Sequence, residues 1–80
     1  MSWYVYILQN PSGRLYKGMA QDSDARLGDH NAGKVKSTKA FVPWKIIYVE
    51  EMESRTAARE REKYFKSGAG RRYIKKYILD

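Results

Sequence analysis

Residues 3–20 of the chain read WYVYILQNPSGRLYKGMA, and this stretch decides the fold that we expect. Its tetrapeptide NPSG has proline where a type I turn requires φ of about −65° and glycine where the chain needs a positive φ. These residues favour a three-residue hairpin loop closed by a glycine bulge, which would pair Asn10 with Arg14. The stretch therefore predicts two antiparallel strands, from about Trp3 to Gln9 and from about Arg14 to Met19.

The predicted loop also sets the register of the two strands. Leu8 would lie opposite Tyr16 and Tyr6 opposite Gly18, so residues of equal parity share a face. Tyr4, Tyr6 and Tyr16 would then lie on one face, with Tyr6 and Tyr16 as diagonal neighbours about 7–8 Å apart. A two-residue or four-residue loop would instead separate the tyrosines. The opposite face would hold the core residues Trp3, Val5, Ile7 and Leu15.

The composition limits the class of protein. Eighty residues make one domain, 1–80, whose core is barely large enough to be stable alone. The absence of cysteine excludes disulfides and thiolate metal sites, and a single histidine argues against a zinc site. No apolar run reaches transmembrane length and no signal-peptide pattern precedes Trp3, so we expect a soluble cytoplasmic protein.

The charge of the chain is positive and uneven. Sixteen lysines and arginines face nine acidic residues, which gives a formal charge of +7. From Arg55 onward there are nine basic and three acidic residues, and the segment Gly33–Ile47 carries four lysines and no acid. A polyanion, most simply nucleic acid, is the leading partner class. The alternative is a basic surface that serves only solubility.

Helix signals follow the hairpin in three places. Asp22 or Ser23 can cap a short helix through Asn31, ended by Gly33. Ser54 can cap a second helix, SRTAAREREKYFKS, closed by Gly68. Gly70 would separate it from a last helical segment, RRYIKKYIL, whose apolar residues recur at helical spacing.

The segments between these helices complete the order β-β-α-β-α-α. Residues 34–42 read as a basic, mobile loop. PWKIIYVEE reads as a third strand, with Pro43 placed before it rather than within it. We therefore expect a small α/β (α+β) sandwich in which helices cover the sheet.

Two helices carry side chains suited to phosphate chemistry. Arg26 and His30 are four residues apart on one helix face, where arginine could bind phosphate oxygens and histidine could move a proton. A merely solvated face is the alternative. On the second helix, Glu60 and Glu62 lie on the two flanks of the apolar face, and periodicity does not choose between them. Arg61 falls near the middle of that face, so it either snorkels past the core or points into a polar site.

Short motifs follow one another along the chain: Tyr4-Val5-Tyr6, Tyr16-Lys17-Gly18, Arg26-Leu27, His30-Asn31, Ala58 and Glu62-Lys63. Together they resemble the GIY-YIG nuclease superfamily, above all its small single-domain bacterial members. The resemblance covers nearly the whole chain, because order and spacing agree at five separated places. The first motif reads Tyr-Val-Tyr rather than Gly-Ile-Tyr. The second reads Tyr-Lys-Gly, with Lys17 where an aliphatic residue is usual, and strand alternation points Lys17 away from Tyr16.

The resemblance implies a three-stranded antiparallel sheet flanked by helices, and it implies roles for five residues. Tyr6 and Tyr16 would line the site, and one of them would be the general base; Tyr6 is favoured because it ends the first motif. Arg26 would stabilise charge on the phosphate, and His30 would assist or orient the tyrosine. Glu62, rather than Glu60, would hold a single Mg²⁺ or Mn²⁺ ion.

The expected function is that of a metal-dependent endonuclease hydrolysing phosphodiester bonds in nucleic acid, DNA rather than RNA, in repair or recombination. A protein partner could supply the target, because so short a chain has little room to read sequence. The alternative from another class is a nucleic-acid-binding module with little or no cleavage activity. An interaction protein using the RRYIKKYIL face ranks below both. The residues expected to grip phosphates are Lys34, Lys36, Lys39, Arg71, Arg72 and Lys75.

Overall fold

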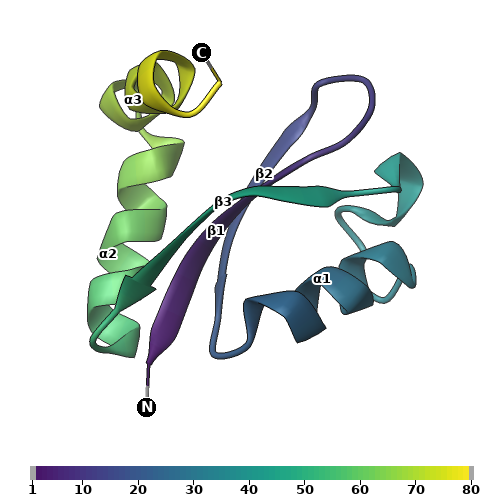
Figure 1. Ribbon diagram of the computed structural model, residues 1–80, viewed down its shortest axis with the longest axis horizontal. Coiled ribbons are helices and arrows are strands. Elements are labelled where there is room, and N and C mark those ends of the chain that lie inside the picture. The colour runs from purple at the N-terminus through teal and green to yellow at the C-terminus, as the bar shows by residue number, and fades with distance from the viewer. Residues whose placement is uncertain (1, 80) are drawn as a thin grey trace.

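The computed structural model describes residues 2–79 and has the predicted order of elements (Figure 1). Its three strands form one antiparallel sheet in the order β2-β1-β3, so β1 is central. Within residues 2–79 no helix combines the length and the apolar character needed to cross a membrane. The elements are β1 (Trp3–Gln9), β2 (Leu15–Ala20), α1 (Ser23–Asn31), the 3-10 turn η1 (Lys39–Phe41), β3 (Lys45–Met52), α2 (Arg55–Lys66) and α3 (Gly68–Tyr77).

The hairpin between β1 and β2 has the predicted loop and register. The Asn10 amide donates to the Arg14 carbonyl at 3.1 Å, and Gly13 has φ +87°. Leu8 pairs with Tyr16 and Tyr6 with Gly18, which confirms that the tyrosines share a face. The second strand begins at Leu15 and extends to Ala20, one residue later at each end than predicted.

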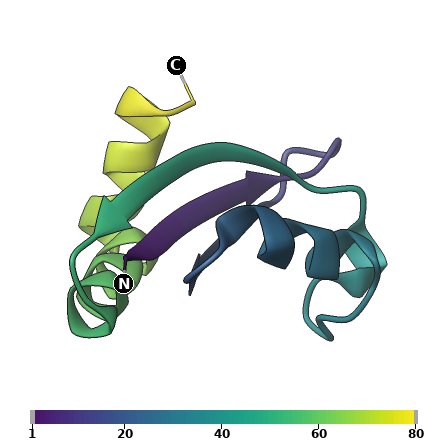
Figure 2. The same cartoon turned by 60° about the horizontal axis from the view of Figure 1, so that its bottom comes forward.

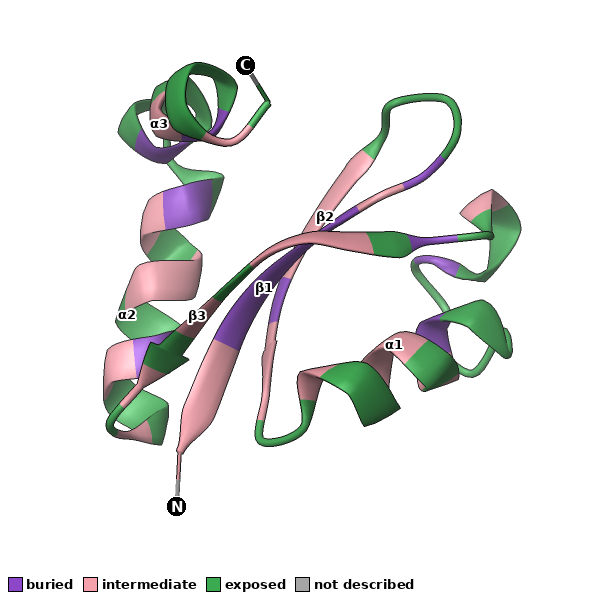
Figure 3. Ribbon diagram, viewed as in Figure 1, coloured by how far each residue is buried: buried purple, intermediate pink, exposed green. Residues whose placement is uncertain are grey.

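Each face of the sheet packs against its own group of elements (Figures 1 and 2). The face with Val5 and Ile7 packs against α2 and α3, and the face with Tyr6 and Leu8 packs against α1 and the segment that follows it. The middle of β1 is buried over four successive residues (Figure 3). Burial on both faces makes β1 the most rigidly held support for a functional side chain in the sheet.

The segment from 34 to 42 does not form the open loop that we predicted. Thr38 is 1% exposed, and the 3-10 turn η1 follows it. The Trp44 indole donates to the Thr38 carbonyl at 3.0 Å. Asn31, the last residue of α1, accepts from the Trp44 amide at 2.6 Å and donates to the Trp44 carbonyl at 3.0 Å. These contacts hold the segment against the end of α1, where hydrophobic burial of Trp44 overrides its polar sequence.

The corner between α2 and α3 corrects two glycine predictions. Gly68 does not close α2; Ser67 ends α2 and also caps α3, accepting from the Gly70 amide at 3.1 Å. Gly70 lies within α3 rather than before it. A Cβ at position 70 would lie 1.8 Å from the Tyr64 carbonyl oxygen, so glycine is required there by close approach of the two helices.

Arg61 forms a polar cluster on the α2 face of the sheet. Its Nε donates to Glu50 Oε1 at 2.8 Å, and the Tyr48 hydroxyl donates to Glu50 Oε2 at 2.6 Å. The guanidinium lies 4.6 Å from the centre of the Phe65 ring. Arg61 therefore pairs with a carboxylate at the margin of the core, and its place on the apolar face has a structural explanation.

Candidate active site

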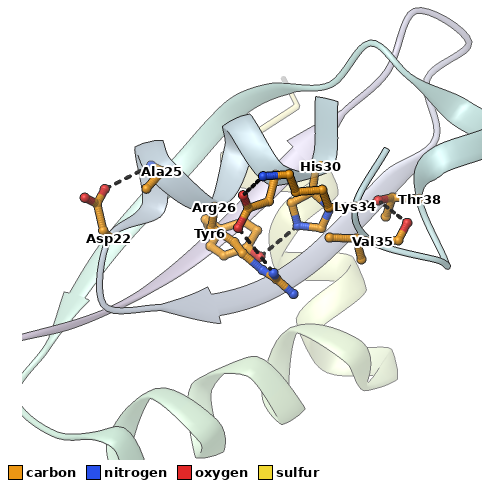
Figure 4. Close-up of polar contacts among 9 residues, drawn as sticks. Tyr6, Asp22, Ala25, Arg26, His30, Lys34, Val35 and Thr38 are labelled. Carbon is orange, nitrogen blue, oxygen red and sulfur yellow. Dashed lines mark hydrogen bonds and ion pairs between the residues drawn. The ribbon is translucent and has the colours of Figure 1, made fainter. Parts of the chain in front are cut away.

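Tyr6 lies at the centre of the candidate site (Figure 4). Its side chain is 1% exposed, and its hydroxyl lies 3.0 Å from Nε2 of His30, the last but one residue of α1. Its partner across the strands is Gly18, which has no side chain to compete for the space. A Cβ at position 18 would lie 2.5 Å from the Tyr6 hydroxyl oxygen. The ring of Tyr6 therefore packs directly against the backbone of β2 at Gly18.

Tyr16 packs beside this pair. Its ring centre lies 6.4 Å from that of Tyr6 and 4.9 Å from that of His30. Tyr16 is partly exposed, whereas Tyr6 is buried. Tyr4, the third tyrosine on this face, lies farther along β1 and lines a separate hollow with Asp22 and Val49. The structure therefore brings together two of the three tyrosines.

The environment keeps the Tyr6 phenol protonated. The pKa of Tyr6 is raised to about 12, chiefly by burial and with contributions from the charges of Tyr16 and Glu62, while Arg26 opposes the shift. Burial also lowers the pKa of His30, with Arg26 adding to that effect and Asp29 opposing it. A neutral phenol consequently faces a neutral imidazole.

Arg26 lies one helical turn before His30, as the spacing predicted. Its guanidinium Nη1 is 3.6 Å from an Asp29 carboxylate oxygen, and its side chain is 42% exposed. The charge of Arg26 acts on both Tyr6 and His30. A cation that is partly open to solvent beside a buried tyrosine–histidine pair is suited to an anionic group arriving from solution.

Glu62 lies on α2, the helix that packs against the Val5 and Ile7 face of the sheet. Its side chain is 21% exposed and lies 3.7 Å from the Lys66 ammonium, while Glu60 is exposed. Glu62, unlike Glu60, acts on the pKa of Tyr6, so the structure distinguishes the two carboxylates that periodicity did not. Across residues 2–79 no group of three or more acidic, histidine or cysteine side chains gathers to enclose a metal ion. A single carboxylate fits Mg²⁺, which keeps several waters and takes its other ligands from phosphate.

The predicted phosphate-gripping residues form two separate groups. Both groups are exposed, and they lie near opposite ends of the molecule (Figures 1 and 2). Lys34 also lies 3.9 Å from Asp29. One group, in the segment after α1, contains Lys34, Lys36 and Lys39, and the other, on α3, contains Arg71, Arg72 and Lys75.

Lys17 belongs to a further group of cations, of which the sequence predicted only Arg71 to bind phosphate. It pairs with Ile7 and is partly buried on the Val5 and Ile7 face, as alternation predicted. Burial lowers the pKa of Lys17, and Arg71 and Lys66 lower it further. Strand β2 and helices α2 and α3 thus bring three positive charges near one another.

The family described as the GIY-YIG catalytic domain matches residues 2–77. The chain belongs to the GIY-YIG family. The resemblance to the GIY-YIG superfamily is therefore confirmed, and a GIY-YIG catalytic domain implies a nuclease-like fold.

Relatives of this GIY-YIG chain include small bacterial proteins. A UPF0213 protein of Streptococcus sanguinis is 44% identical over 64 residues, which cover 79% of this chain and 74% of the relative. A UPF0213 protein of Bacillus licheniformis is 37% identical over 78 residues, covering 96% and 79%. The solution NMR structure of a UPF0213 protein from Bacillus halodurans has a TM-score of 0.56 at 30% identity, covering 92% of this chain and 82% of that one.

Proposed function

We propose that this protein is a divalent-metal-dependent endonuclease that hydrolyses phosphodiester bonds in DNA. The observation that carries the proposal is the 3.0 Å contact between the Tyr6 hydroxyl and His30 Nε2, held in a buried position beside the partly exposed Arg26. A buried acid–base pair next to an accessible cation suits the hydrolysis of an anionic ester.

Tyr6 would activate the attacking water. Because its pKa is about 12, its phenol carries a proton at neutral pH and is a base only if that proton leaves as another arrives. His30 Nε2, 3.0 Å away, would be the acceptor of that proton. The water proton would pass to the Tyr6 oxygen and the Tyr6 proton to His30, while the resulting hydroxide attacks phosphorus and the P–O bond to the leaving oxygen breaks. The leaving oxygen would take a proton from solvent. Tyr16 would line the site and restrict the position of the water.

Arg26 and a metal ion held by Glu62 would stabilise the negative charge on the phosphate. The guanidinium of Arg26 would donate to non-bridging oxygens, whose negative charge increases in the transition state. Glu62 would hold a Mg²⁺ or Mn²⁺ ion, which would supply Lewis-acid chemistry toward the phosphate. Lys66, 3.7 Å from Glu62, would add positive charge on the same side.

The two basic groups would hold the flanking backbone of the substrate. They contribute exposed lysines and arginines at both ends of the molecule, which neutralise phosphates without reading bases. We therefore propose cleavage that depends on the structure of the nucleic acid rather than its sequence. Flapped and branched DNA, as formed in repair and recombination, is the substrate class to test first.

A cleavage assay on labelled duplex, flapped, branched and single-stranded DNA and on RNA tests the proposal, with Mg²⁺, Mn²⁺ or EDTA. Glu62→Ala and Arg26→Ala are the site variants, and Glu60→Ala and Arg59→Ala are matched controls from exposed positions of α2. We expect metal-dependent cutting that both site variants lose and both controls keep.

A nucleic-acid-binding module remains the alternative, favoured by the exposed cations of α3. Salt-sensitive binding with no cutting by the parent protein under any metal would favour that module over the nuclease. Equal loss of binding and cutting in Glu62→Ala would also count against the roles proposed here, because a metal ligand should affect cutting far more than binding.

A further inference from the structure

Behind His30 lies a second polar contact that the proposed reaction does not yet use. Nδ1 of His30 is 2.7 Å from Oγ1 of Thr38, and the two side chains are 0% and 1% exposed (Figure 4). Tyr6, His30 and Thr38 therefore form a continuous line of polar atoms through the interior, from β1 through α1 to the segment before η1.

The direction of each hydrogen bond along this line follows from what each atom can donate. The Thr38 hydroxyl lies 3.4 Å from the Val35 carbonyl, a long contact to an oxygen that also accepts from the Thr38 and Lys39 amides. In one of the two possible arrangements the single hydrogen of the hydroxyl points to that carbonyl. Its lone pair then faces His30 and accepts from Nδ1–H. A neutral imidazole with hydrogen on Nδ1 has a bare lone pair on Nε2, which accepts from the Tyr6 hydroxyl.

The opposite tautomer would leave a buried donor unsatisfied. With hydrogen on Nε2, His30 would donate to the Tyr6 oxygen, and the phenol hydrogen would need another acceptor. The Tyr6 hydroxyl is hydrogen-bonded to His30 Nε2, and the Arg26 guanidinium that also acts on it can only donate. A buried hydroxyl without an acceptor is costly, so the Nδ1–H tautomer is preferred.

Thr38 is itself held by several contacts. Its carbonyl accepts from the Trp44 indole at 3.0 Å, and its amide donates to the Val35 carbonyl at 3.1 Å. The Asn31 side chain in turn accepts from the Trp44 amide and donates to the Trp44 carbonyl. The hydroxyl of Thr38 is thus fixed in place before any substrate arrives, which is the condition for orienting a proton acceptor.

We propose that Thr38 is a positioning residue that holds His30 in the Nδ1–H tautomer, so that Nε2 is free to take the Tyr6 proton. This inference rests on the proposed function for its catalytic use. After proton transfer His30 carries hydrogens on both nitrogens, and Thr38 goes on accepting from Nδ1. Thr38 touches no substrate; it acts through His30.

The test starts with the parent protein and needs no cleavage. His30 is the single histidine of the chain, so a long-range ¹H–¹⁵N correlation spectrum of ¹⁵N-labelled protein reports its tautomer without ambiguity. We expect a protonated-type Nδ1 and an unprotonated-type Nε2 above neutral pH. The reverse assignment would overturn the proposal whether or not the protein is a nuclease.

Variants then test whether Thr38 sets that tautomer. Thr38→Val removes the acceptor at nearly constant volume, and Thr38→Ser keeps it; circular dichroism checks that each variant folds. We expect Thr38→Val to shift the tautomer toward Nε2–H and to lower kcat by about 10²-fold or more at nearly constant KM. Thr38→Ser should keep the parent tautomer and a kcat close to that of the parent protein.

Three results would oppose the proposal. An unchanged tautomer in folded Thr38→Val would show that Thr38 does not set it. Loss of kcat in Thr38→Ser with the parent tautomer retained would also contradict it. If the parent protein cuts nothing with any metal, the proposed function fails, and with it the catalytic use of Thr38. The measured tautomer then still decides whether Thr38 holds His30 with hydrogen on Nδ1. If Thr38→Val does not fold, the spectra of the parent protein and of Thr38→Ala test in the same way whether Thr38 sets the His30 tautomer.

Discussion

Gly18 and Tyr6 face each other across two strands so closely that no side chain can stand between them. A Cβ at position 18 would lie 2.5 Å from the hydroxyl oxygen of Tyr6 and 2.6 Å from its Cζ. Gly18→Ala should therefore push the ring away from His30, destabilise the protein by about 1–3 kcal/mol and abolish cleavage. Urea denaturation and the cleavage assay measure both effects.

Gly28→Ala is the matched control for that substitution. Position 28 is exposed within α1, and a Cβ there would meet nothing within 4 Å. Because alanine favours helix over glycine, stability should rise by about 0.5–1 kcal/mol with cleavage unchanged. Wild-type stability and activity in Gly18→Ala would contradict the close seating of Tyr6.

Tyr6→Phe separates the two tyrosines of the site. Removing the Tyr6 hydroxyl leaves His30 Nε2 without its 3.0 Å partner and takes away the proposed base. We expect kcat to fall by about 10²–10⁴-fold with substrate binding retained. Tyr16→Phe should have the smaller effect, and single-turnover kinetics compare them. A larger loss in Tyr16→Phe would reassign the base to Tyr16.

The stability of the protein should depend on pH through His30. Because burial lowers the pKa of His30 in the folded protein, the unfolded chain takes up a proton first as the pH falls through about 6.5. The free energy of unfolding should be fully maintained above that pH and decline below it. Urea denaturation between pH 5 and 8 measures the slope. His30→Gln should remove most of the slope, and an identical slope in that variant would assign it to other groups.

Glu50 should matter for stability and not for the chemical step. Its carboxylate accepts from Arg61 at 2.8 Å and from Tyr48 at 2.6 Å, and its side chain is 26% exposed. Glu50→Ala leaves both donors unpaired, and a cost of about 1–3 kcal/mol is expected, toward the low end because water can reach the pair. Thermal unfolding tests this against the exposed Glu53→Ala, and unchanged stability would show that the cluster contributes little.

Lys17 should lower the stability of the folded protein and contribute to phosphate binding. Its position beside Arg71 and Lys66 disfavours its own charge, so Lys17→Met should raise the free energy of unfolding by about 0.5 kcal/mol. The same change should lower the salt dependence of DNA binding by about one phosphate contact. Lys63→Met, from an exposed position of α2, is the control. Equal salt slopes in parent and Lys17→Met would place Lys17 outside the interface.

The features that the sequence predicted correctly depend on short-range chemistry. The turn residues from Asn10 to Gly13 set the loop, the loop set the register, and the register placed Tyr6 and Tyr16 on one face. The spacing of Arg26 and His30 likewise needed only the helical repeat. The roles proposed for these residues stay predictions.

The features that the sequence did not predict depend on contacts between distant segments. Thr38 reaches His30 because Trp44 buries its ring and pulls the basic segment inward, which local polarity does not indicate. The partner of Arg61 lies on β3, so pattern within α2 left its role open. The sequence predicts a break at Gly70 because helix propensity is local, whereas the contact that requires glycine there comes from Tyr64 in the preceding helix.

The corner at Ser67 and Gly70 has a consequence for how this protein could change over evolution. One hydroxyl ends α2 and begins α3, and any side chain at position 70 would collide with the α2 backbone. The angle at which α3 leaves the domain is therefore not open to gradual adjustment by substitution at that position. New substrate shapes would have to be accommodated by altering the length of α3 or the residues on its surface, with the corner itself retained.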